Sequence, residues 1–293
     1  MQRLLALAIV ALLSMTGCSF GTAEKGPISA PGSAAKVNTS SQEEPNKSAA
    51  KGVTLTLKKT YKGFQAPTGL AMDRDGNLYV SNWSGNSVTK VGAAGNYSTF
   101  ADGMGSPAGL AFDQAGNLYV ADYSRDIIYK VTPSGEKIIF VKELHTPTGI
   151  TFNQAGDLLV SNRSSNEIVK ITASGKIELV AKGMRTPVGV AEDSDRNLYV
   201  TNYGGNILKV TPEGAISTLS THFGRPGVGI DISRQNVIFA ADNGDGCVRR
   251  LAPDGSTEIV ADNIGGCVAV LVHEDTLYVG GWNEGAVYVY SIN

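Results

Sequence analysis

Residues 67–82 read PTGLAMDRDGNLYVSN, and residues 107–122, forty positions later, read PAGLAFDQAGNLYVAD. The same Pro-x-Gly-aliphatic start returns at Pro147 and again at Pro187. A fixed period of this size is the sequence signature of a repeat architecture. Residues 53–293 have room for six such periods.

Each period contains four short stretches with strand character, separated by turns rich in Gly, Asn and Asp. In the first period these stretches are residues 69–72, 77–81, 87–91 and 97–101. Four strands in about 40 residues are typical of one blade of a β-propeller. We therefore predict an all-β fold, a six-bladed β-propeller of four-stranded antiparallel blades.

The ends of the repeat region predict how the ring closes. A fourth-strand pattern at residues 55–60 precedes the first complete period, and the chain ends on a third strand at residues 286–290. We expect the N-terminal strand to join the C-terminal blade, because this pairing removes an open seam.

The Pro-x-Gly start, the Asn-Leu-Tyr-Val second strand and the hydrophobic-Lys-Val third strand resemble the NHL repeat family across residues 53–293. The first four repeats match well. The fifth is looser and carries Asp231 where others have Ala71 or Ala111, and the sixth lacks the Pro-x-Gly start. This resemblance implies the propeller fold, but a fold alone does not supply a function.

The chain begins with MQRLLALAIVALLSMTGC (residues 1–18), in which Arg3 precedes an apolar run of about ten residues. Such a run is too short to span a bilayer and predicts a signal peptide. Small residues directly before Cys18 resemble the lipobox of bacterial lipoproteins. This implies a leader at residues 1–17, acylation of Cys18, and an extracytoplasmic protein held at a membrane by lipid. The outer membrane is expected in a host that has one, and an ordinary secretory leader is the alternative.

Residues 19–52 are dominated by Ser, Ala, Gly, Lys and Pro and contain a single aromatic residue. Such a stretch cannot bury enough apolar surface to offset its ordering entropy. We expect residues 18–52 to comprise the lipidated cysteine and a flexible tether, and residues 53–293 to form the propeller.

Charge and motif content narrow the classes of function. Lys and Arg total 25 against 27 Asp and Glu, a net charge of −2 at pH 7, so we expect no nucleic-acid partner. Three Cys exclude a dense disulfide scaffold and a CxxC zinc site. No HExxH or GxSxG motif is present, and we expect no cofactor.

The loops between second and third strands carry large side chains at one equivalent position. We predict that these residues line one rim of the ring, on the usual ligand face of a propeller: Trp83, Tyr123, Arg163, Tyr203, Asn243 and Trp282. Aromatic and Arg side chains suit recognition of a protein, peptide or glycan in the cell envelope. Packing over neighbouring blades is the alternative.

Two further sets of polar residues fall near the same face. The fourth-to-first loops add groups that could hold a carboxylate or phosphate, namely His145, Arg185, His222 and Arg225. Loops that bind nothing are the alternative. The second strands end in Asn82, Asp122, Asn162, Asn202 and Asp242. We expect these regularly repeated side chains to bond nearby backbone amides in turns.

Glu192 stands where the earlier repeats have Met72, Phe112 and Phe152. A carboxylate among core residues loses solvation unless it is paired. We expect a structural ion pair with Arg185 or Arg225, and a catalytic acid or metal ligand is the alternative.

The chain also resembles propellers of the streptogramin lyase and gluconolactonase kind. This resemblance implies an alternative function, a metal-dependent lyase or hydrolase with its site at the channel mouth. His145, Glu192 and His222 are the residues that could serve it. We favour a binding module over an enzyme, and a structural envelope protein is a third interpretation.

Cys247 begins the third strand of blade five, and Cys267 begins the first strand of blade six, at the same end of the ring. Disulfides persist outside the cytoplasm, so we expect a bond between them. The third strand lies outside the first, so the loop must bend inward to bring the two residues within reach. Two unlinked thiols are the alternative.

Overall fold

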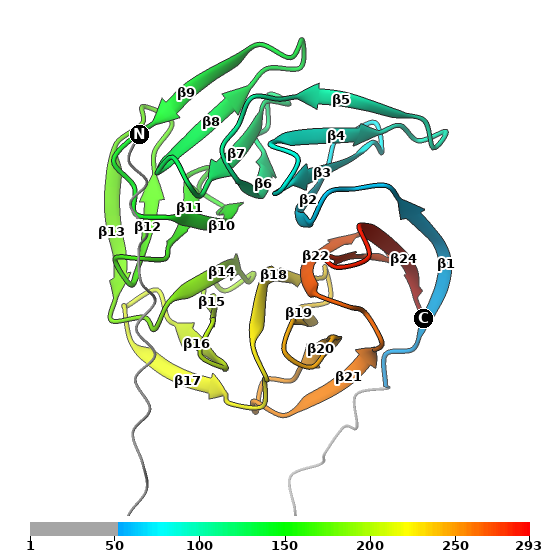
Figure 1. Ribbon diagram of the computed structural model, residues 1–293. Coiled ribbons are helices and arrows are strands. Elements are labelled where there is room, and N and C mark those ends of the chain that lie inside the picture. Colours follow the sequence, from blue (N-terminus) through cyan, green and yellow to red (C-terminus); the bar gives the residue numbers. More distant parts are fainter. Residues whose placement is uncertain (1–51) are drawn as a thin grey trace, which may run out of the picture. The chain divides into compact units, whose positions relative to one another are not determined.

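The computed structural model describes residues 52–293, which form six four-stranded antiparallel sheets arranged in chain order around a central axis (Figure 1). No helix occurs in this part of the chain. The six-bladed propeller predicted from the repeats is confirmed. The predictions for the leader, for Cys18 and for the tether fall on residues 1–51, outside the described residues.

Every blade has the same strand order from the axis outward. The innermost strands are β2 (Pro67–Met72), β6 (Pro107–Phe112), β10 (Pro147–Phe152), β14 (Pro187–Glu192), β18 (Pro226–Ile232) and β22 (Cys267–His273). The second strands are β3 (Leu78–Asn82), β7 (Leu118–Asp122), β11 (Leu158–Asn162), β15 (Leu198–Asn202), β19 (Ile238–Asp242) and β23 (Thr276–Gly281).

The outer half of each blade follows the same pattern. The third strands are β4 (Ser87–Val91), β8 (Ile127–Val131), β12 (Glu167–Ile171), β16 (Asn206–Val210), β20 (Cys247–Leu251) and β24 (Ala286–Ile292). The outermost strands are β5 (Tyr97–Ala101), β9 (Lys137–Val141), β13 (Ile177–Lys182), β17 (Ile216–Ser220), β21 (Thr257–Ala261) and β1 (Leu55–Lys62).

The two ends of the described chain share one sheet, with strand order β1-β24-β23-β22. Strand β1 pairs with β24 from Leu55 opposite Ile292 to Lys62 opposite Ala286. Figure 1 shows the blue N-terminal strand beside the dark red C-terminal one. The expected closure is therefore confirmed.

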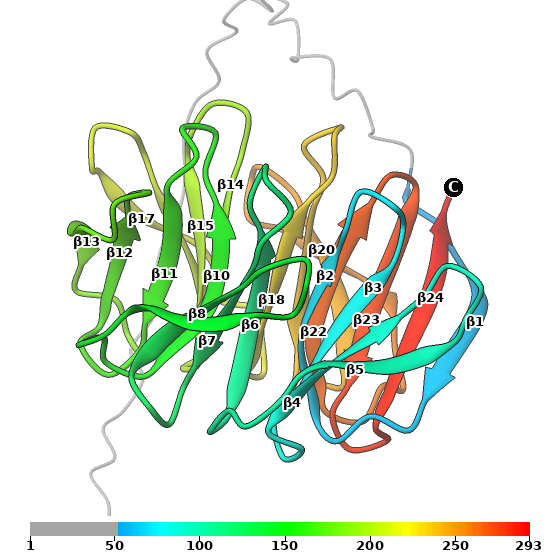
Figure 2. The same cartoon turned by 90° about the horizontal axis from the view of Figure 1, so that it is seen from above.

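Figure 2 shows the strands running between two faces of the ring. One face carries the second-to-third loops and the fourth-to-first loops, and we call it the rim face. The other carries the tight first-to-second and third-to-fourth turns, and we call it the turn face. At the turn face the Asp73 carboxylate accepts hydrogen bonds from Asn77 and from the Tyr79 hydroxyl. Asp193 accepts equivalent bonds in blade four, so these polar groups fix turn geometry.

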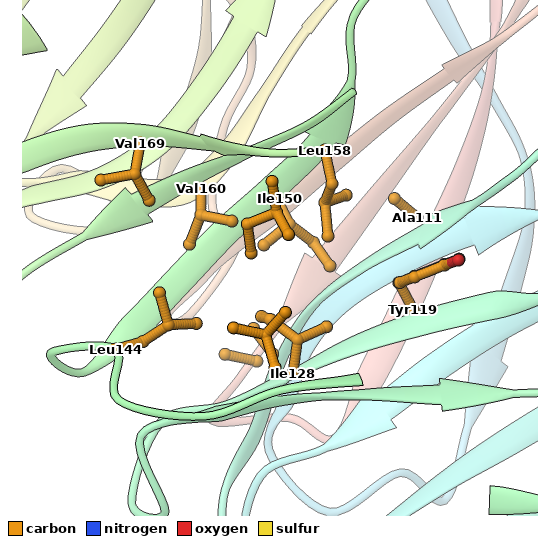
Figure 3. Packing of buried hydrophobic residues seen from close by; sticks show 12 residues of the cluster. Ala111, Tyr119, Ile128, Leu144, Ile150, Leu158, Val160 and Val169 are labelled. Atoms are coloured by element: carbon orange, nitrogen blue, oxygen red, sulfur yellow. The ribbon is translucent and has the colours of Figure 1, made fainter. Parts of the chain in front are cut away.

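Apolar side chains from neighbouring blades interlock to form the core. Figure 3 shows one cluster, in which Ile128 and Leu144 pack with Ile150 and Val160 across the junction of blades two and three. All four side chains are buried. Adjacent blades therefore stabilise each other through shared burial.

The glycine of the Pro-x-Gly start lets the innermost strands approach closely. A Cβ on Gly149 would lie 2.6 Å from the carbonyl oxygen of Val188 in the next blade. Gly69, Gly109 and Gly189 meet the backbone of the following blade in the same way. The repeat needs glycine here because a methyl group would force the inner strands apart.

We expect Gly149→Ala to lower the free energy of unfolding by about 1–3 kcal/mol, because the added methyl overpacks against backbone that cannot move aside. The matched control is Gly204→Ala, since a Cβ at Gly204 meets nothing within 4 Å. The free energy of unfolding of the control should stay within about 0.5 kcal/mol of that of the parent. Urea unfolding followed by circular dichroism measures both, and equal stabilities would contradict the close-approach argument.

Candidate functional site

Each second-to-third loop is held by the loop that enters its own blade. The backbone N–H of Trp83 donates to the carbonyl of Ala66 at 3.2 Å, and that of Tyr123 donates to Ser106 at 3.0 Å. The equivalent pairs in the other blades are Arg163–Thr146, Tyr203–Thr186, Asn243–Arg225 and Trp282–Gly266. This repeated bond gives the six large residues the same placement in successive blades.

The Asx residues that end the second strands fix the same loops. Asn162 Oδ1 accepts from the backbone N–H of His145 at 2.6 Å, and Asn202 Oδ1 accepts from that of Arg185 at 3.1 Å. Asp242 accepts from the backbone N–H groups of Gly224 and Arg225. These hydrogen bonds confirm that the Asx side chains stabilise the loops by accepting from backbone N–H groups.

In blade six a different residue fixes the loop that enters the blade. It has Gly281 at the Asx position, and Glu284 Oε1 accepts from the backbone N–H of Gly265 at 2.8 Å instead. Sequence reasoning missed Glu284 because the substitute carboxylate lies three positions later in the chain.

The rim face contains a pocket of about 340 Å³, which we call the rim pocket. Its large lining side chains are Trp83, Tyr123, Arg163, Tyr203, Arg225, Asn243 and Trp282. Of the ten residues that the sequence predicts for this face, the structure brings seven together here. His145, Arg185 and His222 are exposed and do not line this pocket, and Arg185 lines a separate cleft with Phe223.

Arg163 is the central polar group of the rim pocket. Its Nη1 donates to the Tyr123 hydroxyl at 2.6 Å, and its guanidinium carbon lies 5.6 Å and 5.0 Å from the ring centroids of Tyr123 and Tyr203. Its Nε is buried and has no hydrogen-bond partner. Among residues 52–293 Arg163 forms no ion pair.

A second guanidinium and a pair of stacked rings complete the pocket. Arg225 Nη1 donates to the Tyr203 hydroxyl at 3.0 Å. The rings of Trp83 and Tyr123 lie 4.8 Å apart. No Asp or Glu is among the residues that line the pocket. The pocket therefore offers two uncompensated positive charges beside aromatic surface, a combination suited to an anion with an apolar body.

The metal-site alternative fails on geometry. Glu192 ends β14 at the turn face, whereas His145 and His222 are in loops at the rim face, so these three residues do not converge. Glu192 Oε2 accepts from the backbone N–H of Gln154 at 2.7 Å and pairs with neither Arg185 nor Arg225, so the expected ion pair is wrong.

No group of three His, Cys, Asp or Glu able to hold a metal occurs within residues 52–293. The described residues thus do not fit the metal site that the lyase and lactonase resemblance implies.

The expected disulfide is absent: Cys247 and Cys267 are free, buried thiols. Cys247 lies on the third strand of blade five, and Cys267 lies on the innermost strand of blade six. The two residues therefore belong to different sheets and to different distances from the axis. Burial raises the pKa of Cys247 to about 11 and raises that of Cys267 as well. Both thiols are therefore protonated at neutral pH.

Asp231 is the ionisable residue among those that line the central channel. It lines a cavity of about 90 Å³ together with Leu70, Ile150 and Val270. Its Oδ2 accepts from the backbone N–H of Val272 in blade six at 2.7 Å. Burial raises its pKa to about 6, although hydrogen bonds from backbone N–H groups oppose the shift.

We expect the Asp231 contribution to stability to fall as pH rises. Its folded pKa, about 6, exceeds the ordinary value of 3.8, so the folded chain binds the proton more tightly than the unfolded chain. The contribution is full below about pH 4 and is lost as pH rises through about 6.

Asp231→Asn removes the pH-dependent contribution of the Asp231 carboxyl to the free energy of unfolding. The difference in unfolding free energy between parent and variant should therefore change by about 1 kcal/mol or more between pH 4.5 and pH 7. Urea titrations at several pH values measure it. Asp275→Asn, in an exposed turn, is the control. A difference between the parent and the Asp231→Asn variant that stays constant with pH would refute the assignment.

Comparison with known proteins finds a matching family model and solved structures of the same fold. A family model described as the virginiamycin B lyase family matches residues 55–273. No curated protein matches the sequence.

Three solved structures share the fold. The virginiamycin B lyase from Staphylococcus aureus is 14% identical over 82% of this chain and 99% of its own, with a TM-score of 0.63. A catalytically inactive histidine-to-alanine variant of it, solved with quinupristin, gives 14%, the same coverages and a TM-score of 0.62. A gluconolactonase from Xanthomonas campestris is 16% identical over 80% of this chain and 88% of its own, with a TM-score of 0.73. The resemblance to lyase and gluconolactonase propellers is therefore confirmed at the level of fold.

Proposed function

This chain belongs to the virginiamycin B lyase family, and from that premise we propose that its rim pocket binds an anionic protein, peptide or glycan ligand. The observation that carries the proposal is Arg163, whose buried Nε lacks a partner and whose guanidinium lacks a counterion among the described residues. A buried cationic donor left in this state is costly. A ligand carboxylate, phosphate or sulfate would supply the missing acceptor and charge.

The aromatic side chains define the other half of the ligand. Trp282 is 39% exposed and Tyr203 is 41% exposed, so both rings are available for contact. Indole and phenol rings gain binding energy by stacking on flat apolar groups, and they lose little conformational entropy in doing so. We therefore infer a ligand that places a ring or another apolar group beside its anionic group.

Catalysis in the rim pocket is the second candidate, and the family match supports it. The ionisable side chains that line the pocket are those of Tyr123, Tyr203, Arg163 and Arg225. An elimination here would therefore need a tyrosine hydroxyl as proton acceptor, with the paired guanidinium stabilising the phenolate. This differs from a mechanism that depends on histidine.

The cellular location is part of the same proposal. The lipobox-like sequence before Cys18 supports attachment to a bacterial membrane through lipid, with the propeller outside the cytoplasm. Among residues 52–293 no helix could cross a membrane. A lipid anchor would hold the rim pocket close to ligands of the cell envelope.

Binding is tested with N-acetyl-phenylalanine, which joins an aromatic ring to one carboxylate, and with its uncharged amide. We expect calorimetry to detect the acid and to find the amide at least tenfold weaker. Arg163→Gln should lower the affinity for N-acetyl-phenylalanine at least tenfold, about 1.4 kcal/mol, because it removes the unpaired charge. Arg234→Gln, at an exposed turn on the other face, is the control. Equal affinity of acid and amide would refute the anion site.

Catalysis is tested with quinupristin, the ligand of the S. aureus variant structure. A lyase opens a ring without adding water, so the product should keep the mass of the substrate and change its chromatographic retention. If the rim pocket is catalytic, Tyr123→Phe should abolish this product while retaining binding of N-acetyl-phenylalanine. An unchanged substrate after prolonged incubation would contradict lyase activity on quinupristin.

A further inference from the structure

The first two seams between blades are each filled by three aromatic rings. Tyr79 lies 4.8 Å from Phe100 and 4.9 Å from Phe112, in edge-to-face contact, at the seam of blades one and two. Tyr119 lies 5.0 Å from Phe140 and 5.2 Å from Phe152 at the next seam. Such pairs contribute beyond simple burial. The full aromatic trio is particular to these two seams, because the equivalent positions between blades four and five hold Tyr199, Leu219 and Ile232.

The seam of blades three and four lacks all three rings. The equivalent positions hold Leu159 on β11, Val180 on β13 and Glu192 on β14. A cavity of about 340 Å³ opens there, lined by these three residues together with Leu198 and Arg196. We call it the seam pocket. It is on the turn face, away from the rim pocket, and its apolar wall includes the buried side chains of Leu159 and Leu198.

Hydrogen bonds across this seam add to the apolar packing between the two blades. The backbone N–H of Gln154 in blade three donates to Glu192 Oε2 at 2.7 Å. The Gln154 side-chain amide donates to the carbonyls of Asp193 and Ser194 in blade four at 2.8 Å and 3.2 Å. The two blades are thus joined at the inner end of the seam, while the space beyond it stays open.

The seam pocket carries one free charge of each sign. Lys170 is neutralised by Asp157 at 3.6 Å and by Glu178 at 3.2 Å. Glu192 and Arg196 also line the pocket, and neither forms an ion pair within the described part of the chain. An unpaired carboxylate and an unpaired guanidinium beside an apolar wall are complementary to a zwitterion with an apolar side chain.

We propose that the seam pocket binds a small aromatic zwitterion of the α-amino acid class. The ring of the ligand occupies the space that the aromatic trio fills in the first two seams. The ammonium group pairs with Glu192, and the carboxylate pairs with Arg196. This site is independent of the function proposed for the rim pocket.

The test uses three compounds that share a phenyl ring. L-phenylalanine carries both charges, phenethylamine carries the positive charge alone, and 3-phenylpropionate carries the negative charge alone. Calorimetry on the full chain should detect L-phenylalanine and find each singly charged analogue at least tenfold weaker. Glu192→Gln and Arg196→Gln should each lower the affinity for L-phenylalanine at least tenfold. Arg74→Gln, at the equivalent exposed turn of blade one, is the matched control and should not.

A filled variant locates the site. Leu159→Tyr with Val180→Phe and Glu192→Phe restores the residues of the aromatic trio, so it should raise the melting temperature and abolish binding of L-phenylalanine. The two single charge variants decide the matter if the filled variant does not fold. Absence of L-phenylalanine binding, equal binding of an analogue, or binding that survives in the folded filled variant would each overturn the proposal.

Discussion

The propeller depends on how closely six inner strands can approach one axis. Their backbones meet where the Pro-x-Gly glycines lie, and a Cβ on Gly69, Gly109 or Gly149 would overlap the backbone of the next blade. This contact sets the radius of the ring. The radius in turn sets how far apart the second-to-third loops stand, and therefore whether residues from opposite blades can share a pocket. The rim pocket exists because Trp83 and Tyr203, from blades one and four, both reach it.

Much of this arrangement could be predicted from the sequence because it repeats. A period of 40 residues specifies the blade, and the same loop position in each period specifies which side chains gather at the rim face. The prediction failed where the chain departs from its own repeat. Glu192 was placed near Arg185 and Arg225, although it ends an inner strand and so lies on the opposite face. The partner of Glu192 is a backbone N–H, and backbone partners leave no trace in residue identity.

Variation among the repeats also distinguishes stability from recognition. The residues that recur in five of the six blades, such as the inner-strand glycines and the Asx side chains, hold backbone to backbone. The residues that differ from blade to blade, such as Arg163, Tyr203 and Trp282 at the rim, include those with unsatisfied charge or exposed rings. A ring of near-identical blades cannot recognise an asymmetric ligand unless equivalent positions carry different chemistry. The family match and the residues that line the rim pocket are consistent with this division.

The closure of the ring has a consequence for how the protein is made. Strand β1 precedes every other described strand in the sequence, whereas its partner β24 follows all of them. Blades one to five can each form from consecutive residues, but the sixth must wait until β24 has been synthesised. Contacts of such sequence separation form late and slowly. Until then β1 presents an unpaired edge, the kind of surface on which chains associate wrongly. A chain that lacks β24 would thus have five formed blades and no closed ring.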